Sequence, residues 1–469
     1  MQEFLKEIIV GIVGPLVLPL FYIGGFTTIL ITVFKRAEVG VYVLVAFIPL
    51  TNIRYAFHSF PLGKDFVDIM MLAVALGILL NKNGFQRARH SWLLGIFIIM
   101  NYIALWHSSL SYSLPYPIDT DSALLKDWKN YSEMIFLYYL IFNCVQNERH
   151  QRILITIMTT VLLLINLREF RNFTEGGAFS YDKRIEGPFW VEGLGANHLG
   201  AFVAHYSMAM LGLYLCDDNR LRRWLYVGAI FFGLHPLFFS YSRGAYLAVF
   251  VAVAFLGFVK KRSLLILLAV IFIGWQTLLP QTVVERITMT ESPTGELEHS
   301  ASERVVLWEH ALDLFSENPL FGVGFGAFGF SVTQSALRDT HNFYMRTLSE
   351  QGIIGSILFL LVLVGALRSG WDLFRSAQTP FHRGLGLGFT ACVIAVMVTN
   401  LFGDRWSYFS IGGYFFVLWG LVDRAIYMIA EQRAASEAPP NLAGASESLP
   451  GAPVPEAGAR STTELPRTS

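Results

Sequence analysis

Repeated apolar runs are the feature of this sequence that most constrains its fold. A run of roughly 17–25 residues, coiled as an α-helix, crosses the approximately 30 Å hydrocarbon layer of a bilayer. Only 15% of the 469 residues are charged, whereas soluble domains carry about 25%. The runs also lack the two-residue alternation of barrel strands, so helices are the element that can satisfy the backbone in lipid. We therefore predict an all-α polytopic membrane protein.

The runs predict about twelve membrane spans, or about thirteen to fourteen with the amino-terminal segment. That segment, residues 8–34, contains prolines and a Gly-Gly pair, which fit either one kinked span or a short helical hairpin. Its flank has no net positive charge and no cleavage site follows it, so a cleaved signal peptide is not expected. The other predicted spans are 39–53, 66–80, 91–109, 131–145, 152–167, 196–216, 224–240, 243–259, 263–280, 353–369, 384–402 and 408–426.

The charges of the connecting loops predict the orientation of the chain. Short connections rich in Lys and Arg face the cytoplasm. They are residues 35–36, 82–90, 148–152, 218–223, 260–262 and 368–383. The alternate loops are longer, and the longest of them, residues 280–352, is therefore expected outside the cytoplasm.

Four parts follow from this pattern. They are transmembrane helices with short loops (1–279), a large periplasmic loop with short amphipathic helices (280–352), carboxy-terminal transmembrane helices (353–430) and a tail (431–469). The tail is rich in Ala, Pro, Ser and Glu and poor in aromatic residues. Such a composition cannot bury a core, so we predict a disordered cytoplasmic tail.

The large loop contains a predicted amphipathic helix. Between Ser302 and Phe315, apolar residues including Trp308 recur every three or four positions and share one face. Ser302 is the predicted cap, and Asn318-Pro319 is the predicted end. An apolar face with a Trp, opposite charged residues, is typical of a helix at the membrane interface. On spacing alone, Arg304 is a solvated charge of the polar face.

His341 lies near the end of the same loop. Asp339 or Thr340 can cap a helix that runs to about Gln351 and stops at Gly352. His341 would then lie in the first turn, where the helix dipole keeps an imidazole neutral and able to accept a hydroxyl proton. Free N–H groups at a helix start also suit a diphosphate. A structural, hydrogen-bonding histidine explains the same sequence equally well.

Other polar features adjoin the apolar runs. Arg243 joins two runs with almost no loop, where an arginine either snorkels to water or has a partner. The predicted external segment 168–195 carries positive charge against the positive-inside trend, which an anionic ligand would explain. Its basic residues are Arg168, Arg171, Lys183 and Arg184. The glycine-dense segment 322–329 allows close approach to a ligand, but it matches no nucleotide-binding motif and is interpreted as a plain loop.

Several patterns do not support a site. Asp119 and Asp121 have the Asp-x-Asp spacing of metal-dependent glycosyltransferases, but in a Ser/Pro-rich loop they are better explained as turn residues. His205 and His235 lie within apolar runs and are expected to be packed and hydrogen-bonded. The three cysteines lack metal or disulfide spacing. The net charge is zero, so we predict no nucleic-acid partner, and we expect neither a metal nor a cofactor.

Four motifs, in this order, resemble the bacterial O-antigen ligase and O-antigen polymerase superfamily. They are RIEGPFWVEGLGANHLGAF (184–202), SYSRGAYL (240–247), SERVVLWEHALDLFSENPLFGVGFGAF (302–328) and HNFYMRTLSEQGIIG (341–355). The resemblance covers residues 180–420, whereas the first 150 residues add only a compatible hydropathy pattern.

The resemblance implies an inverting, metal-independent glycan transfer at the outer face of the bacterial inner membrane. The implied donor is a glycan on undecaprenyl diphosphate. The implied acceptor is a sugar hydroxyl on lipid A–core for a ligase, or on another carrier-linked repeat for a polymerase. By motif position, the implied catalytic residues are Arg243, Arg304 and His341. The implied substrate-binding residues are Arg184, Asn342, Tyr344, Glu303 and Trp308.

Within the superfamily we favour a repeat-unit polymerase for O-antigen or exopolysaccharide. The alternatives are an O-antigen ligase, a protein O-oligosaccharyltransferase and, in another class, a polysaccharide flippase or exporter. Transporters place ionisable groups in mid-membrane, and the central parts of these runs hold few of them, which favours an enzyme. Membrane lipids are expected partners, and a chain-length regulator or other polysaccharide-assembly proteins are candidate partners.

Overall fold

The structure is a computed structural model that describes residues 14–81, 84–176, 184–288, 299–332 and 339–437. Within these ranges the regular secondary structure is helical and contains no strand, so the predicted all-α fold is confirmed. Most of the predicted tail lies outside the described residues. Its first seven residues, 431–437, are helical.

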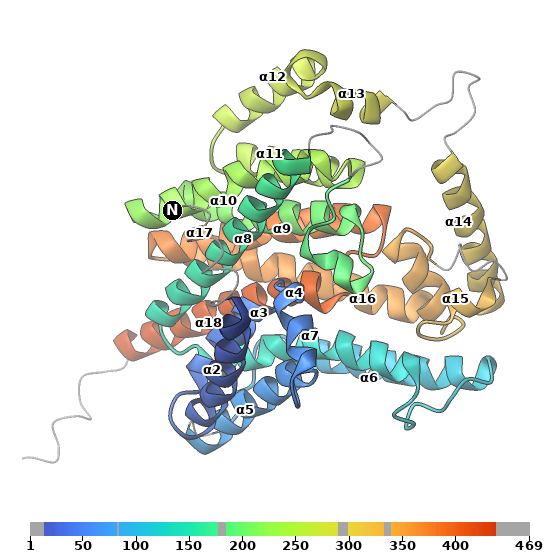
Figure 1. The fold of residues 1–469 in the computed structure, drawn as a ribbon, viewed down its shortest axis with the longest axis horizontal. Helices are drawn as coiled ribbons and strands as arrows, with labels where there is room; N and C mark the ends of the chain where they lie inside the picture. Colours follow the sequence, from blue (N-terminus) through green and yellow to red (C-terminus); the bar gives the residue numbers. More distant parts are fainter. Residues whose placement is uncertain (1–13, 82–83, 177–183, 289–298, 333–338, 438–469) are drawn as a thin grey trace, which may run out of the picture. The chain divides into compact units, whose positions relative to one another are not determined.

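Helices coincide with the predicted apolar runs (Figure 1). They are α2 (Gly14–Phe34), α3 (Ala37–Phe47), α4 (Thr51–Ala56), η2 (Phe57–Ser59), α5 (Phe66–Asn81), α6 (Ser91–Ser111), α7 (Ala123–Cys144), α8 (Glu148–Gly176), η3 (Gly187–Glu192), α9 (Ala196–Cys216), α10 (Arg220–Phe239), α11 (Arg243–Val259), α12 (Ser263–Leu278), α13 (Gln281–Thr288), α14 (His299–Glu317), α15 (Phe328–Ser331), α16 (Phe343–Ser376), α17 (Pro380–Thr399), η5 (Asn400–Phe402) and α18 (Phe409–Glu437). The described part of the amino-terminal segment, residues 14–34, is one helix, α2, and not a hairpin.

Not every predicted span forms a helix that meets both the length and the hydropathy of a membrane span. Among the described residues, six are long and apolar enough: α6, α8, α9, α16, α17 and α18. The number rises to eight if two bent pairs, α3 with α4–η2 and α12 with α13, each form one span. The difference has physical causes, because α5 and α11 have only 16 and 17 residues. The first half of α7 also carries several charged residues.

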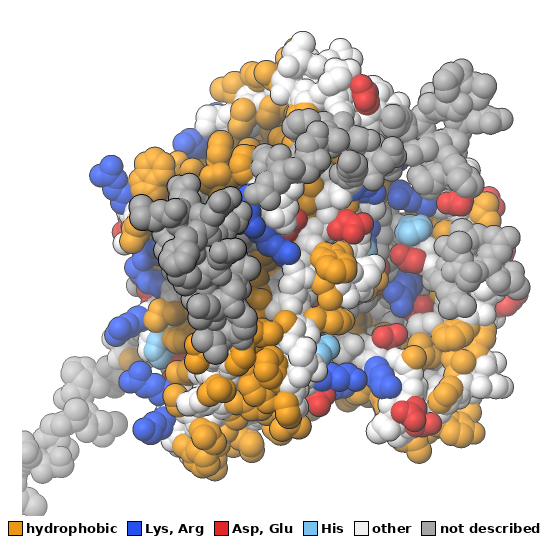
Figure 2. Space-filling view, in the orientation of Figure 1, with side chains coloured by type: hydrophobic (Ala, Val, Ile, Leu, Met, Phe, Trp, Pro, Cys, Tyr) orange, Lys and Arg blue, Asp and Glu red, His pale blue; other side chains and the backbone are white. Residues whose placement is uncertain are grey.

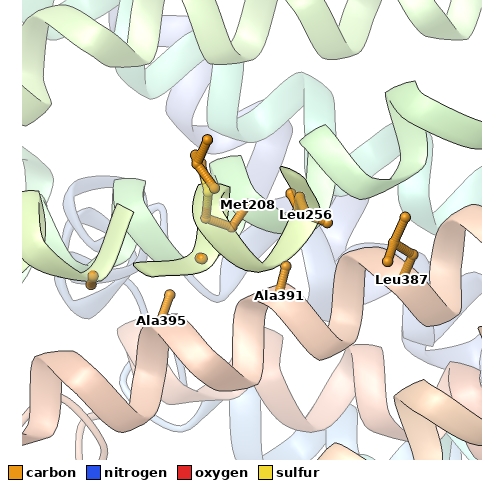
Figure 3. Close-up of a cluster of buried hydrophobic side chains, with 8 residues drawn as sticks. Met208, Leu256, Leu387, Ala391 and Ala395 are labelled. Atoms are coloured by element: carbon orange, nitrogen blue, oxygen red, sulfur yellow. The ribbon is translucent and has the colours of Figure 1, made fainter. Parts of the chain in front are cut away.

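The core is centred on α9 and α17, which pack against each other along their length (Figure 1). A Cβ atom at Gly212 of α9 would lie 2.2 Å from the Cα atom of Gly388 in α17, so only glycine permits this approach. Small residues bring helix backbones together in this way within membranes. Figure 3 shows the cluster of buried side chains next to this contact, in which Met208 and Leu256 face Ala391 of α17.

Helix α16 is interrupted at Gly352, where the sequence predicted a helix stop. Gly352 has φ 62° and ψ −161°, a conformation that is essentially restricted to glycine. A Cβ atom there would lie 2.5 Å from the carbonyl carbon of Leu320. The break separates a short polar segment, Phe343–Gln351, from the long apolar remainder.

Replacing Gly352 with alanine is expected to destabilise the protein by about 3 kcal/mol or more, because strain and a backbone clash add. Thermal unfolding of the detergent-solubilised protein measures this change. Gly95→Ala in α6 is the matched control, since a Cβ at Gly95 meets no atom within 4 Å. The control is expected to unfold at or above the wild-type temperature. Equal unfolding temperatures for Gly352→Ala and wild type would contradict the role of the break.

Candidate functional site

The helix that follows His341 begins later than predicted. Asn342 is its cap, and the side-chain oxygen of Asn342 accepts from the backbone N–H groups of Tyr344 (3.0 Å) and Met345 (3.3 Å). The expectation that Asp339 or Thr340 caps the helix is therefore wrong, as is the placement of His341 in the first turn. All three polar residues are able to cap a helix, and the one next to the first helical residue does so.

His341 is instead held by Asp339. The backbone of His341 has φ 50°, in the left-handed region, and its N–H donates to Asp339 Oδ1 at 3.2 Å. His341 Nδ1 lies 3.3 Å from Asp339 Oδ2. Within the described chain, Nε2 has no hydrogen-bond partner, and 45% of the side chain is exposed. The ring is thus fixed through one nitrogen, and the other is available to a substrate.

The Asp339 side chain stays ionised at neutral pH. Burial acts to raise the pKa of Asp339, but its bonds to His341 and the charges of His341 and Arg346 hold the pKa at about 2. Because this pKa is depressed, the stabilisation from these contacts is complete above the ordinary value of 3.8 and is lost only as the pH falls toward 2. At neutral pH, a carboxylate therefore stands beside the imidazole.

Helix α14, which carries Arg304, contacts the segment that contains His341. It begins at His299, before the predicted start at Ser302, and ends at Glu317, before the predicted stop. Ser302 lies inside the helix and is not its cap, which corrects that expectation. Trp308 Nε1 donates to the carbonyl oxygen of Thr340 at 2.9 Å, which ties α14 to the residue that precedes His341. Arg304 lies one turn before Trp308 and shares its face, so the interpretation of Arg304 as a charge of the opposite, solvated face is wrong; its side chain is partly buried.

A network of buried charges lies beneath His341. Arg346 Nε donates to Glu350 Oε1 at 3.2 Å, and its Nη1 donates to Asp404 Oδ2 at 2.9 Å. Glu350 also accepts from the backbone N–H groups of Gly326 and Phe328. Asp404 accepts from two N–H groups of its own loop. The network joins α16, the glycine-rich loop and the connection before α18.

Arg405, next to Asp404, extends this network. Its Nη1 lies 2.6 Å from His198 Nε2 at the start of α9. Because a guanidinium only donates, His198 Nε2 must accept, and the ring proton is therefore on Nδ1. Burial lowers the pKa of Arg405, the carboxylates of Asp404 and Asp339 raise it, and the charge of Arg304 lowers it. The bond from Trp308 to Thr340 and the bond from Arg346 to Asp404 bring α14, the start of α16 and the loop of Arg405 together.

Arg243 is the first residue of α11. The preceding turn is fixed by Arg184, whose Nε and Nη2 donate to the carbonyl oxygen of Ser240 at 2.9 and 2.6 Å. A Cβ atom at Gly244 would lie 2.9 Å from the side chain of Phe402, so the start of α11 packs directly onto the segment that leads to Asp404. Lys183, the neighbour of Arg184, lies outside the described residues.

The glycine-rich loop serves packing, as the plain-loop interpretation predicted. The N–H of Gly324 donates to the carbonyl oxygen of Glu350, and that of Phe325 donates to Ala104 of α6. A Cβ atom at Gly324 would lie 2.4 Å from the backbone nitrogen of Ser108. Positive φ angles and these close approaches explain the glycines without a ligand.

Most of the remaining predicted residues make contacts within the protein. The Tyr344 hydroxyl donates to the Met397 carbonyl at 2.9 Å, and the Asn342 oxygen caps α16, so these polar groups hold the structure. Trp308 positions α14, and Glu303 lies on that helix one residue before Arg304. Asp119 accepts from the N–H of Asp121, as expected of a turn.

A patch of charged side chains is visible at the surface beside α14 (Figure 2). Figure 2 shows basic, acidic and histidine side chains close together beside α14, with apolar surface around them. Sequence reasoning missed Arg346, Glu350, Asp404, Arg405 and His198. The sequence did point to Asp404 and Arg405, because these charged residues lie between two apolar runs, where a charge is costly without a partner. The arrangement can hold an anion near a histidine that is oriented by a carboxylate.

The fold and this site define a helical, multi-pass membrane protein with a polar site where several helices begin or end. Residues 228–360 match the family model described as O-antigen ligase. The match covers less than half of the chain, and it confirms the resemblance to the O-antigen ligase and O-antigen polymerase superfamily. Arg243, Arg304 and His341 all lie in the matched region, whereas Arg184 lies outside it. No curated protein matches the chain.

Proposed function

We propose that the protein transfers a glycan from undecaprenyl diphosphate to an acceptor sugar hydroxyl at the periplasmic face of the bacterial inner membrane. Repeat-unit polymerisation for O-antigen or exopolysaccharide is the preferred form of this reaction. The proposal places the segment 280–352 in the periplasm and the carboxy-terminal tail in the cytoplasm. It follows from the family match and from the alternation of basic and longer loops.

One observation carries the proposal. Three separate parts of the O-antigen ligase domain, the start of α11, helix α14 and the segment before α16, converge on the loop that contains Asp404 and Arg405. These three segments carry Arg243, Arg304 and His341, which we assign to one site. A basic region beside an oriented histidine matches the two requirements of the reaction, which are to bind a diphosphate and to remove a hydroxyl proton.

The reaction is a direct displacement at the anomeric carbon. The acceptor oxygen forms a bond to this carbon while the bond from the carbon to the diphosphate oxygen breaks, which inverts the configuration. The acceptor proton moves to Nε2 of His341, and Asp339 stabilises the imidazolium that forms. The leaving diphosphate carries its negative charge away and needs no proton.

Arginines are suited to the leaving group. A guanidinium binds phosphate oxygens through paired hydrogen bonds and stays charged when it is partly buried. We assign Arg243 and Arg304 to the diphosphate, where fixed positive charge stabilises the transition state. Arg346 and Arg405 are engaged with Glu350, Asp404 and His198, so their role is to hold the loops in place.

Arg243→Ala and Arg304→Ala are each expected to lower glycan transfer about 10²–10³-fold, because each removes one preformed charge contact. The variants are expressed in a strain that lacks the protein, and glycan products are separated by length. Arg87→Ala is the control, since Arg87 is exposed and stacks on Trp92 away from the site. Normal products from both site variants would contradict the assignment.

The glycan profile of the deletion strain separates the alternatives. Loss of a polymerase leaves single repeats on the carrier, and loss of a ligase leaves long glycans on it. Loss of a flippase confines repeats to the inner leaflet. If glycosylated proteins disappear while lipopolysaccharide is normal, the acceptor is a protein hydroxyl. Single repeats exposed at the periplasmic face are the result that we expect.

A further inference from the structure

A separate cavity of about 370 Å³ lies where α9 ends and α10 begins. Its lining consists of Tyr214, Arg220, Arg223, Trp224 and Val227. None of these residues belongs to the site described above. The cavity combines cationic side chains with aromatic and aliphatic ones, which suits an amphiphilic ligand.

The two arginines of the cavity differ from their neighbour Arg222. Arg222 pairs with Asp217 through two hydrogen bonds of 2.7 Å. The guanidinium of Arg223 lies 4.9 Å from the centre of the Tyr214 ring, an arrangement that fixes a cation by cation–π attraction. Arg220 is exposed and, in the described part of the chain, has no carboxylate partner. Two positive charges therefore line the cavity, and no carboxylate among the described residues forms a salt bridge with either of them.

The position of the cavity along the helices sets its depth in the membrane. Helix α9 is long and apolar enough to span a bilayer and ends at Cys216, so the cavity lies near the level of the lipid headgroups. Trp224 and Leu221 are 64% and 80% exposed. Tryptophan is enriched at this membrane–water boundary. An exposed Trp and Leu beside two arginines thus face both the acyl chains and the headgroups.

Further positive charge surrounds the cavity. Lys260 and Arg383 lie close enough to Cys216, the last residue of α9, for their charges to act on its thiol, as does the opposite charge of Asp217, which is paired with Arg222. Figure 2 shows Lys and Arg side chains along the left-hand edge, at the end where α10 begins in Figure 1. A basic surface at headgroup level attracts anionic lipids.

We propose that this cavity binds the phosphate headgroup of an anionic phospholipid. Arg220 and Arg223 donate to the phosphate oxygens, since guanidinium groups bind phosphate in a paired geometry. The acyl chains lie against Trp224 and Val227. The bound lipid connects α9 to α10 at the membrane surface, and this role is independent of the glycan-transfer reaction.

The test measures lipid binding to the full-length protein in detergent by native mass spectrometry. Phosphatidylglycerol, phosphatidylcholine and inorganic phosphate are titrated separately. Wild-type protein is expected to retain phosphatidylglycerol in preference to phosphatidylcholine. Arg220→Gln and Arg223→Gln are each expected to weaken phosphatidylglycerol binding about fivefold, and both together about thirtyfold. The control is Arg262→Gln, a basic residue of the next connection that does not line the cavity, and it is expected to leave binding unchanged.

Three results would overturn the proposal. If Arg262→Gln weakens phosphatidylglycerol binding as much as the cavity variants do, the lipid binds to a diffuse basic surface and not to a site. Equal retention of phosphatidylcholine would show an unselective apolar groove. Binding of inorganic phosphate as tight as that of the lipid would show a site for a free anion. Thermal unfolding shows whether the double glutamine variant folds. If it does not fold, it is replaced by the double variant with lysine at positions 220 and 223, which keeps both charges.

Discussion

His341→Ala is expected to lower glycan transfer by about 10²–10⁴-fold, the usual contribution of a positioned acid or base. The reason is geometric, because His341 is held through Nδ1 by Asp339 and offers Nε2 to the acceptor. The fold is expected to survive, since 45% of the side chain is exposed and its removal opens no core cavity. Transfer by the purified protein and its thermal unfolding are measured together.

His310→Ala is the matched control for this substitution. His310 lies on α14, and its ring contacts the hydroxyl of Ser331 at 2.9 Å, away from the residues that surround His341. Transfer by this variant is expected to be close to normal. The transfer rate of Asp339→Asn is expected to lie between those of His341→Ala and His310→Ala. The amide can still orient the His341 ring, but the negative charge of the carboxylate is lost. If His341→Ala transfers glycan at the wild-type rate, His341 is not the base.

Arg346→Ala is expected to produce the largest loss of stability. It would leave two carboxylates, Glu350 and Asp404, which are 4% and 2% exposed, without their shared cation. Removing one partner of a buried ion pair costs about 3–5 kcal/mol. The network also fixes the glycine-rich loop through the N–H groups of Gly326 and Phe328. Transfer activity is therefore expected to fall together with the unfolding temperature.

Arg89→Ala provides the comparison for this ion pair. Arg89 and Asp372 also approach to 2.7 Å, but their side chains are 41% and 47% exposed. Exposed pairs contribute only about 0–1 kcal/mol, so this variant is expected to unfold close to the wild-type temperature. Similar unfolding temperatures for Arg346→Ala and Arg89→Ala would show that the buried network does not support the site.

Much of the fold was readable from the sequence because membrane helices depend on local composition. The length and apolarity of each run located the helices, and periodic apolar residues located α14. Gly352 also ended its helix segment as predicted, since its backbone conformation is local to that residue. Among the described residues, six to eight spans meet both the length and the hydropathy of a membrane span, whereas shorter apolar helices such as α5 and α11 and the charged start of α7 fall below one of these limits.

The site was only partly predictable. His341, Arg304 and Arg243 came from motifs, and the structure brings their segments to one loop. The pairing of Arg346 with Asp404 joins residues 58 positions apart, and a single sequence contains no information on such a contact. The cap of α16 was misplaced because Asp339, Thr340 and Asn342 have similar capping ability. Only the backbone geometry selects Asn342, and that choice places His341 outside the helix.

The most direct measurement of the central claim uses the purified protein in vesicles. An undecaprenyl-diphosphate-linked repeat is added at one face with a metal chelator present, and carrier-linked products are separated by length and anomeric configuration. Wild-type protein and His310→Ala are expected to form longer glycans of inverted configuration. His341→Ala is expected to form none above background. An unchanged donor, or a donor that is only moved across the bilayer by the wild-type protein, would contradict glycan transfer at this site.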